Sequence, residues 1–265
     1  MILSRRVALN GVQLDSVDER IVIQGIDEAA GKESISAVSF GGRSGQRVTN
    51  RRRDMLDITV RFGINIRKTD MAGREAVLEA VNSWAAPGGW LTIGHKPGRR
   101  LAVVLAQAPG MGNAREWTNE FSLMFRSYAI PFWEDVTETS AESTGTSAGI
   151  SVPGNVETQA NVTVENTSSG TINTMTITMV TGGKSKAMVF SSLGLAAGEK
   201  LVIDHDTSGL LRIRIQANGG AYRSAMIRRN DESADDFAVV PGTVQCQLTI
   251  SGAHKLTVSA RGRWL

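Results

Sequence analysis

A strand that ends at a proline-aromatic break constrains this sequence more than any other feature. From residue 117 to residue 126 the large apolar side chains share one parity: Trp117, Phe121, Leu123 and Phe125. The polar side chains share the other parity, with only Met124 out of pattern: Thr118, Glu120, Ser122 and Arg126. This two-residue period predicts a central strand with one buried face. Pro131 then ends the sheet, because proline has no N–H to donate to a ladder.

The segment after this break predicts a domain boundary. Residues 136–148 are small and polar and carry almost no apolar side chain. At 265 residues, two domains of ordinary size are the default expectation. We therefore predict a first domain over residues 1–135, a linker over residues 136–148 and a second domain over residues 149–265.

The first domain opens with a predicted hairpin. Asn10 and Gly11 form the strongest two-residue turn signal, because both residues tolerate a positive φ. The glycine-rich stretch from Asp27 to Val48 has little periodicity and predicts a long loop or an extended arm. Every second residue from 58 to 66 is apolar, which predicts a strand with one buried face.

One helix is predicted in the first domain. Val77, Val81 and Trp84 recur at helical spacing, and Asp70 or the threonine before it can cap the first turn. Two strands follow, over residues 90–94 and 101–105. A small sheet with one helix packed on it is an α+β arrangement, either an open sheet or a split barrel.

The second domain is predicted to be a β-sandwich. Short apolar alternations recur from residue 162 to residue 260, and glycine, asparagine and serine separate them. Short strands at near-regular spacing are typical of a sandwich. The whole chain is therefore predicted to be mainly β.

Four short segments resemble the distal tail proteins (Dit-like proteins) of long-tailed siphophages. They are YAIPFW at residues 128–133, LNGVQLDS at 9–16, GLAAGEKLVIDHD at 194–206 and the terminal VSARGRWL at 258–265. The resemblance covers both halves of the chain. It implies that the second domain is a galectin-like or carbohydrate-module-like sandwich.

The same resemblance implies a structural role in the virion, at the phage tail tip. N-terminal domains would join into a hexameric ring between the tail tube and the baseplate, and DNA would pass through the bore without specific binding. The implied partners are the tail tube protein, the tape-measure protein, a tail-associated tip protein and a receptor-binding or side-fibre protein. The C-terminal sandwich would be a docking platform for receptor-binding or side-fibre components. Synthesis in the host cytoplasm is expected, because the N-terminus does not resemble a signal peptide.

Five arginines approach the predicted strand at residue 57 and are candidates for a subunit interface: Arg43, Arg47, Arg51, Arg52 and Arg53. A solvated turn and nucleic-acid binding are the alternatives. The absence of interleaved aromatic residues disfavours nucleic acid. Asn10 and Gly11 in the hairpin are further interface candidates, because a closed ring needs two different complementary surfaces on each subunit.

The residues offer little reactive chemistry. Cys246 is the only cysteine, and its place in an alternating strand predicts a core residue. His205 lies between two aspartates, but neighbouring side chains in a strand point to opposite faces, so a strand end is favoured over a metal site. No serine-hydrolase elbow or phosphate-binding loop is present. We therefore predict no enzyme activity and no cofactor.

A carbohydrate-binding protein is the alternative function. Tyr222 is the one plausible exposed ring in the second domain and the candidate ligand contact. A glycan-cleaving enzyme is supported least, because it needs two carboxylates facing each other across a cleft. The net charge of +3 does not demand nucleic acid, and no apolar run approaches the length of a membrane helix.

Overall fold

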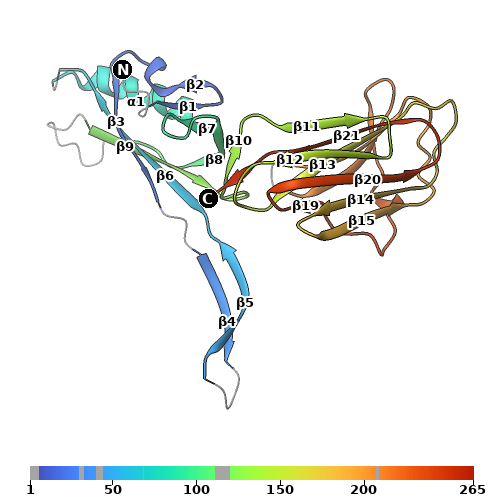
Figure 1. The fold of residues 1–265 in the computed structure, drawn as a ribbon. Helices are drawn as coiled ribbons and strands as arrows, with labels where there is room; N and C mark the ends of the chain where they lie inside the picture. The colour runs from blue at the N-terminus through green and yellow to red at the C-terminus, as the bar shows by residue number, and fades with distance from the viewer. Residues whose placement is uncertain (1–5, 30–32, 40–43, 68, 111–119, 207–208) are drawn as a thin grey trace. The chain divides into compact units, whose positions relative to one another are not determined.

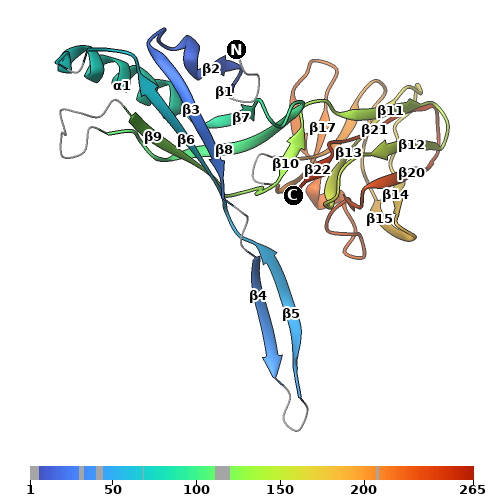
Figure 2. The same cartoon turned by 60° about the vertical axis from the view of Figure 1, so that its left-hand side comes forward.

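The computed structural model describes residues 6–29, 33–39, 44–67, 69–110, 120–206 and 209–265. The chain divides into two compact units, Met1–Trp133 and Glu134–Leu265. Antiparallel sheets dominate both units, as Figures 1 and 2 show, so the predicted mainly β class is confirmed. The described part of the chain has one α-helix.

Unit 1 holds the first nine strands. They are β1 (Val7–Leu9), β2 (Val12–Gln13), β3 (Ile21–Glu28), β4 (Glu33–Ser39), β5 (Gln46–Arg53), β6 (Leu56–Ile64), β7 (Gly89–Ile93), β8 (Arg99–Gln107) and β9 (Glu120–Ser127). A short 3-10 turn, η2 (Leu14–Ser16), precedes β3, and the helix α1 (Met71–Ala85) follows β6. The main sheet has the order β2-β1-β7-β8-β9-β6-β3.

The strand β6 is an interior strand of this sheet and has the one buried face that its strict alternation predicted. It pairs with β3 on one side and β9 on the other. Its apolar side chains Ile58, Val60 and Phe62 are completely buried. The predicted strand that opens at residue 117 is described from Glu120 onward, and its residues before that lie outside the described part of the chain.

The helix α1 forms where its apolar stripe predicted. The Asp70 side chain caps it by accepting a hydrogen bond from the Gly73 N–H at 2.8 Å. Val77 and Val81 are completely buried, and Trp84 meets Phe125 of β9 edge-on with ring centroids 5.9 Å apart. Figure 2 shows α1 beside β6 and β9. The helix therefore covers one face of the sheet, in the predicted α+β arrangement.

Unit 2 is a sandwich of two antiparallel sheets. One sheet has the order β11-β21-β13-β16-β17-β18 and the other β12-β20-β14-β15. Its elements are β11 (Thr139–Ser143), β12 (Ser147–Val152), β13 (Thr158–Asn166), β14 (Met175–Thr181), β15 (Lys184–Phe190), β16 (Lys200–His205), β17 (Leu211–Gln216), β18 (Tyr222–Ser224), η3 (Met226–Arg228), β19 (Ala238–Val239), β20 (Gly242–Ile250), β21 (His254–Ala260) and β22 (Arg263–Trp264).

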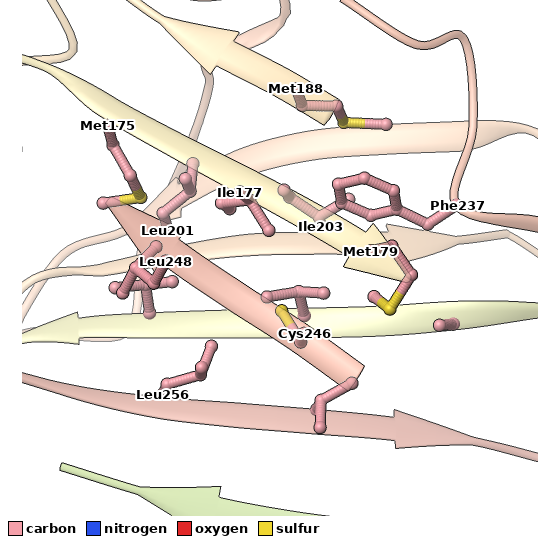
Figure 3. Close-up of a cluster of buried hydrophobic side chains, with 14 of the residues drawn as sticks. Met175, Ile177, Met179, Met188, Leu201, Ile203, Phe237, Cys246, Leu248 and Leu256 are labelled. Carbon is pink, nitrogen blue, oxygen red and sulfur yellow. The ribbon is translucent and has the colours of Figure 1, made fainter. Parts of the chain in front are cut away.

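The core of unit 2 lies between its two sheets. Figure 3 shows Met175, Ile177 and Leu248 of one sheet facing Leu201 and Ile203 of the other. Phe190 and Phe237 belong to this core and are 1% and 0% exposed. The predicted sandwich is therefore confirmed, whereas its galectin-like character remains a prediction.

The predicted linker over residues 136–148 is wrong. Residues 139–143 form β11 and pair with β21, and residues 147–152 form β12 and pair with β20. Only small side chains such as Ala141 and Ala148 face inward there, so the segment lacks the large apolar residues that mark a strand. The short strand β10 (Trp133–Asp135) spans the unit boundary, and the Asp135 N–H donates to the Gly262 carbonyl at 2.9 Å.

Cys246 is a core residue, as its place in an alternating strand predicted. The side chain is completely buried, and this burial raises the pKa of the thiol to about 12. Because only the thiolate reacts, at pH 8 the reactive fraction is about a thousandfold lower than for a free cysteine. We expect iodoacetamide to leave the native protein unmodified and to label Cys246 fully in denaturant, as mass spectrometry would show. Rapid labelling of the native protein would contradict this burial.

Candidate assembly interface

The strands β4 and β5 form an arm, defined here as residues 33–39 and 46–53. They pair only with each other, as a separate two-stranded sheet (Figure 1). The arm extends a ribbon that begins in the main sheet, because β3 leads into β4 and β5 leads into β6. The Ala29 N–H donates to the Asp57 carbonyl at 3.0 Å where the two parts of the ribbon join. The predicted loop or arm over residues 27–48 is thus largely a β-hairpin.

The arm carries apolar side chains that no described residue covers. The pairing places Ile35 and Ala37 on the same face as Val48, because directly paired residues share a face. Ile35 and Val48 are each 56% exposed. Val38 lies on the opposite face, paired with Arg47, and is 47% exposed. Ile35, Ala37 and Val48 therefore form an apolar patch on one face of the arm, called the apolar face, and Glu33 pairs with Arg53 on the same face nearer the main sheet.

Such an arm is poorly stabilised by itself. An isolated two-stranded hairpin is at best marginally stable in water, because it buries too little apolar surface to offset the ordering of its backbone. All described residues of β4 are exposed. The sequence nevertheless gives β4 and β5 isoleucine, valine and threonine, which favour strands. The arm therefore has the properties of a segment that a partner surface completes.

Contacts with aromatic residues hold the root of the arm. Glu28, the last residue of β3, accepts hydrogen bonds from Lys96 Nζ and from Trp133 Nε1, both at 2.7 Å. The Lys96 ammonium also lies 4.8 Å from the centroid of the Trp133 ring. On the other strand, the Arg53 guanidinium lies 5.5 Å from the centroid of Phe132. The base of the arm is thus held by Phe132 and Trp133, the aromatic residues that follow Pro131.

The five candidate arginines are not one loop. Arg47, Arg51, Arg52 and Arg53 lie in β5, and Arg43 lies outside the described residues. The register pairs Arg47 with Val38 and Arg53 with Glu33, so these two arginines lie on opposite faces of the arm. The four described arginines therefore lie in a strand rather than in a turn, and their role in a subunit interface remains a proposal.

The second face of the main sheet in unit 1 carries paired charges. The Arg126 guanidinium binds the Asp57 carboxylate with two hydrogen bonds of 2.6 and 2.8 Å, and this pairing raises the pKa of Arg126. Arg61 of β6 pairs with Asp27 of the neighbouring strand β3 at 2.8 Å. In each of these pairs the charge of the arginine is therefore balanced by a carboxylate on the open face of the sheet.

Asn10 has an internal structural role. It and Gly11 have φ of 52° and 85°, the tight turn that their sequence predicts. The Asn10 amide donates to the Gly88 carbonyl and accepts from the Trp90 N–H, both at 2.8 Å. Gly89 makes room for this amide, because a Cβ at Gly89 would lie 2.2 Å from Asn10 Oδ1. The hairpin is thus joined to the start of β7.

These contacts predict the outcome of Asn10→Gly. Glycine keeps the positive φ but loses both side-chain hydrogen bonds, so we expect unit 1 to lose roughly 1–2 kcal/mol in chemical denaturation. Val12→Ser, at a position 50% exposed on the same hairpin, is the control and should change stability little. A change in assembly mass without a change in stability would instead assign Asn10 to an interface.

The Tyr222 ring of unit 2 is exposed, as predicted. It is 51% exposed on β18, and the Arg214 guanidinium lies 4.4 Å from its centroid. Arg214 and Arg212 both pair with the Asp204 carboxylate, at 2.6 and 3.0 Å. The ring therefore belongs to a polar sheet face that already contains its own ion pairs.

His205 ends β16, where the sequence favoured a strand end. Burial lowers its pKa, so the imidazole is neutral at physiological pH. Its neighbours have other partners, since Asp204 binds arginines and Asp206 accepts a hydrogen bond from the Leu210 N–H at 3.0 Å. Within the described ranges, no three histidine, cysteine, aspartate or glutamate side chains gather as metal ligands, and no helix is long and apolar enough to span a membrane.

Comparisons with known proteins find likeness in structure alone. No protein-family model and no curated protein matches the sequence. The chain is similar to the Dit protein of phage SPP1, described as a paradigm of the hub adsorption apparatus of phages that infect Gram-positive bacteria. The TM-score is 0.68 at 12% identity, over 97% of this chain and 98% of that one.

Two structures of the phage P2 baseplate in its activated conformation are also similar. The chain in the calcium form gives a TM-score of 0.53 at 8% identity, over 92% of this chain and 90% of that one. The chain in the strontium form gives 0.51 at 8% identity, over 97% and 96%. This chain therefore has the fold of a Dit-like phage tail protein.

Proposed function

We propose that this chain is a structural component of a phage tail tip, a distal tail hub that acts by assembly. The likeness to the SPP1 hub protein over nearly the whole of both chains supports this role. The arm is the observation that carries the proposal, because its exposed apolar face needs a partner surface. We propose that a second copy of the chain supplies that surface.

The proposed assembly is a closed hexameric ring of N-terminal units. In a head-to-tail ring, each copy gives one surface and receives a different one. The apolar face of the arm is the surface that each copy gives, and unit 1 of the next copy receives it. The arginines of β5 are proposed to bind carboxylates of the neighbour.

The ring is proposed to lie between the tail tube and the baseplate, with its bore open to DNA and the tape-measure protein. The open face of the main sheet suits the bore wall. Its arginines are already neutralised by Asp57 and Asp27, so the phosphate backbone gains little by binding there. The sandwiches of unit 2 are the docking platform for a tail-associated tip protein and for receptor-binding or side-fibre proteins.

The mass of the purified chain in solution tests this proposal. A chain of 28.4 kDa should give a particle about six times heavier by light scattering, and ring images in negative stain. A monomer at every concentration, including in the presence of purified tail tube protein as a template, would overturn the ring.

A carbohydrate-binding function is the second candidate, and the exposed Tyr222 ring favours it. Under this alternative the protein is a monomer or dimer with measurable affinity for host-surface glycans. Glycan-array binding that Tyr222→Ala abolishes would support it. Binding that survives this substitution would place any sugar site elsewhere.

A further inference from the structure

The strand β18 leaves one edge of the larger sandwich sheet open. All three of its residues are exposed, and its one partner in the described part of the chain is β17. The Ala225 N–H donates to the Ile213 carbonyl, and the Ala217 N–H donates to the Ala221 carbonyl, both at 2.8 Å. Peptide groups alternate in direction along an antiparallel strand. Those of Tyr222 and Ser224 therefore face away from β17.

One edge of the other sandwich sheet, formed by β15, is covered by a further segment of the chain. A segment at residues 228–234 runs along β15 and pairs with it. The Asn230 N–H donates to the Val189 carbonyl at 2.9 Å, and the Ala234 N–H donates to the Ala187 carbonyl at 2.7 Å. Ser233 Oγ accepts from the Val189 N–H at 2.9 Å. Covering an edge in this way prevents unwanted pairing, whereas β18 has no such cover among the described residues.

The open edge is held rigidly in an extended form. The Arg223 guanidinium, on the side of β18 opposite to Tyr222, pairs with the Glu199 carboxylate, including one bond of 2.6 Å to Glu199 Oε2. The same arginine donates to the Gly194 carbonyl at 3.1 Å. This pairing lowers the pKa of Glu199, a buried carboxyl group, so the contact persists at mildly acidic pH. A preordered strand costs a partner less ordering on binding.

The surroundings of β18 define the chemistry of a partner. The 3-10 turn that follows it exposes Met226 and Ile227 by 39% and 86%. Three arginines of β17 and β18, Arg212, Arg214 and Arg223, outnumber the two carboxylates that pair with them, Asp204 and Glu199, and the 3-10 turn ends at a further arginine. A second copy paired with this edge would bring the same arginines together, which disfavours self-association. An acidic strand with apolar residues fits both features.

We propose that β18 is a docking edge for an extended acidic and apolar segment of another virion protein, which adds a strand to the sheet. This inference rests on the proposed role of unit 2 as a platform, and it assigns the place of attachment. A single edge offers few backbone hydrogen bonds, so one contact is weak. Copies of unit 2 in one ring would raise the avidity of a multivalent partner by roughly 10²–10⁴.

The test uses the full-length protein and a labelled synthetic peptide of alternating glutamate and valine. Fluorescence anisotropy gives its affinity, and hydrogen exchange locates it. We expect the peptide to protect the amides of Tyr222 and Ser224. Ser224→Pro removes an outward N–H and should weaken binding about tenfold or more, a loss of about 1.4 kcal/mol for each factor of ten. Ser224→Thr keeps the N–H and the hydroxyl group, and should bind like the parent protein.

Three results would overturn the docking edge. One is unchanged affinity in Ser224→Pro, and another is equal binding of a peptide N-methylated at its pairing positions. The third is the absence of amide protection on β18 at millimolar peptide. If the protein alone associates through β18, its assembly mass should fall in Ser224→Pro. That result would identify a second copy of the chain as the partner of this edge, which also contradicts the proposal. None of these results depends on ring formation, so the docking edge and the ring can fail independently.

Discussion

Replacing Ile35 and Val48 by aspartate is expected to abolish the ring and leave a monomer. Each side chain is 56% exposed on the apolar face of the arm, so neither substitution disturbs a core. Burying such a side chain at an interface contributes roughly 1.5–3 kcal/mol, and two carboxylates there add a desolvation cost. Because this binding free energy is lost at every interface of the ring, even a partial loss at each interface prevents the ring from closing. Light scattering and negative-stain images of the double variant are the measurement.

The opposite face of the arm offers a matched control. Ser34 and Ser36 of β4 share that face and are exposed, so Ser34→Asp with Ser36→Asp adds the same charge to the arm. This control should still form rings. Equal loss of assembly in both double variants would show that charge, rather than apolar contact, decides the result. A ring that survives the Ile35 and Val48 substitutions would exclude the apolar face as the interface.

Much of the fold was predictable from local patterns in the sequence. The alternation in β6, the apolar stripe of α1 and the Asn10-Gly11 turn each depend on neighbouring residues, and each element formed where it was expected. Such patterns report which face of an element is buried. They do not report which distant element covers it.

The errors arise because local sequence patterns do not report contacts between distant elements. The strand β11 and the start of β12 were missed because Ala141 and Ala148 fill the space that large side chains fill elsewhere. The hydrogen bond between Glu28 and Trp133 joins residues far apart in the chain, so no spacing could reveal it. The arm was ambiguous because its apolar residues are few and no partner strand of the main sheet constrains them.

The candidate surfaces were predictable only in part. An arginine cluster before β6 was evident from the sequence. Its place in a strand was not evident, because glycine-rich segments flank that strand. The exposure of Tyr222 was evident from its neighbours, whereas the open edge of β18 depends on strand order. A sequence signal for that edge does exist, because Ile227 is a large apolar residue beside two arginines.

Trp133→Ala is expected to cause the largest loss of stability of any substitution considered. The ring is completely buried, and its Nε1 donates to Glu28 at the root of the arm. Removing a buried tryptophan costs roughly 3–5 kcal/mol, because the transfer free energy is lost and a cavity remains. Chemical denaturation followed by hydrogen exchange should show this loss in β6 and β9, whereas β13 and β20 of unit 2 should keep their protection.

Trp133→Phe separates the ring from its hydrogen bond. Phenylalanine retains most of the apolar volume and loses the N–H, so the expected cost falls to about 1–2 kcal/mol. Glu28 then keeps the Lys96 ammonium at 2.7 Å, which still satisfies its carboxylate. A loss in Trp133→Phe as large as in Trp133→Ala would show that the hydrogen bond to Glu28, rather than the buried ring, stabilises unit 1. Equal destabilisation of both units would contradict the division of the chain at residue 133.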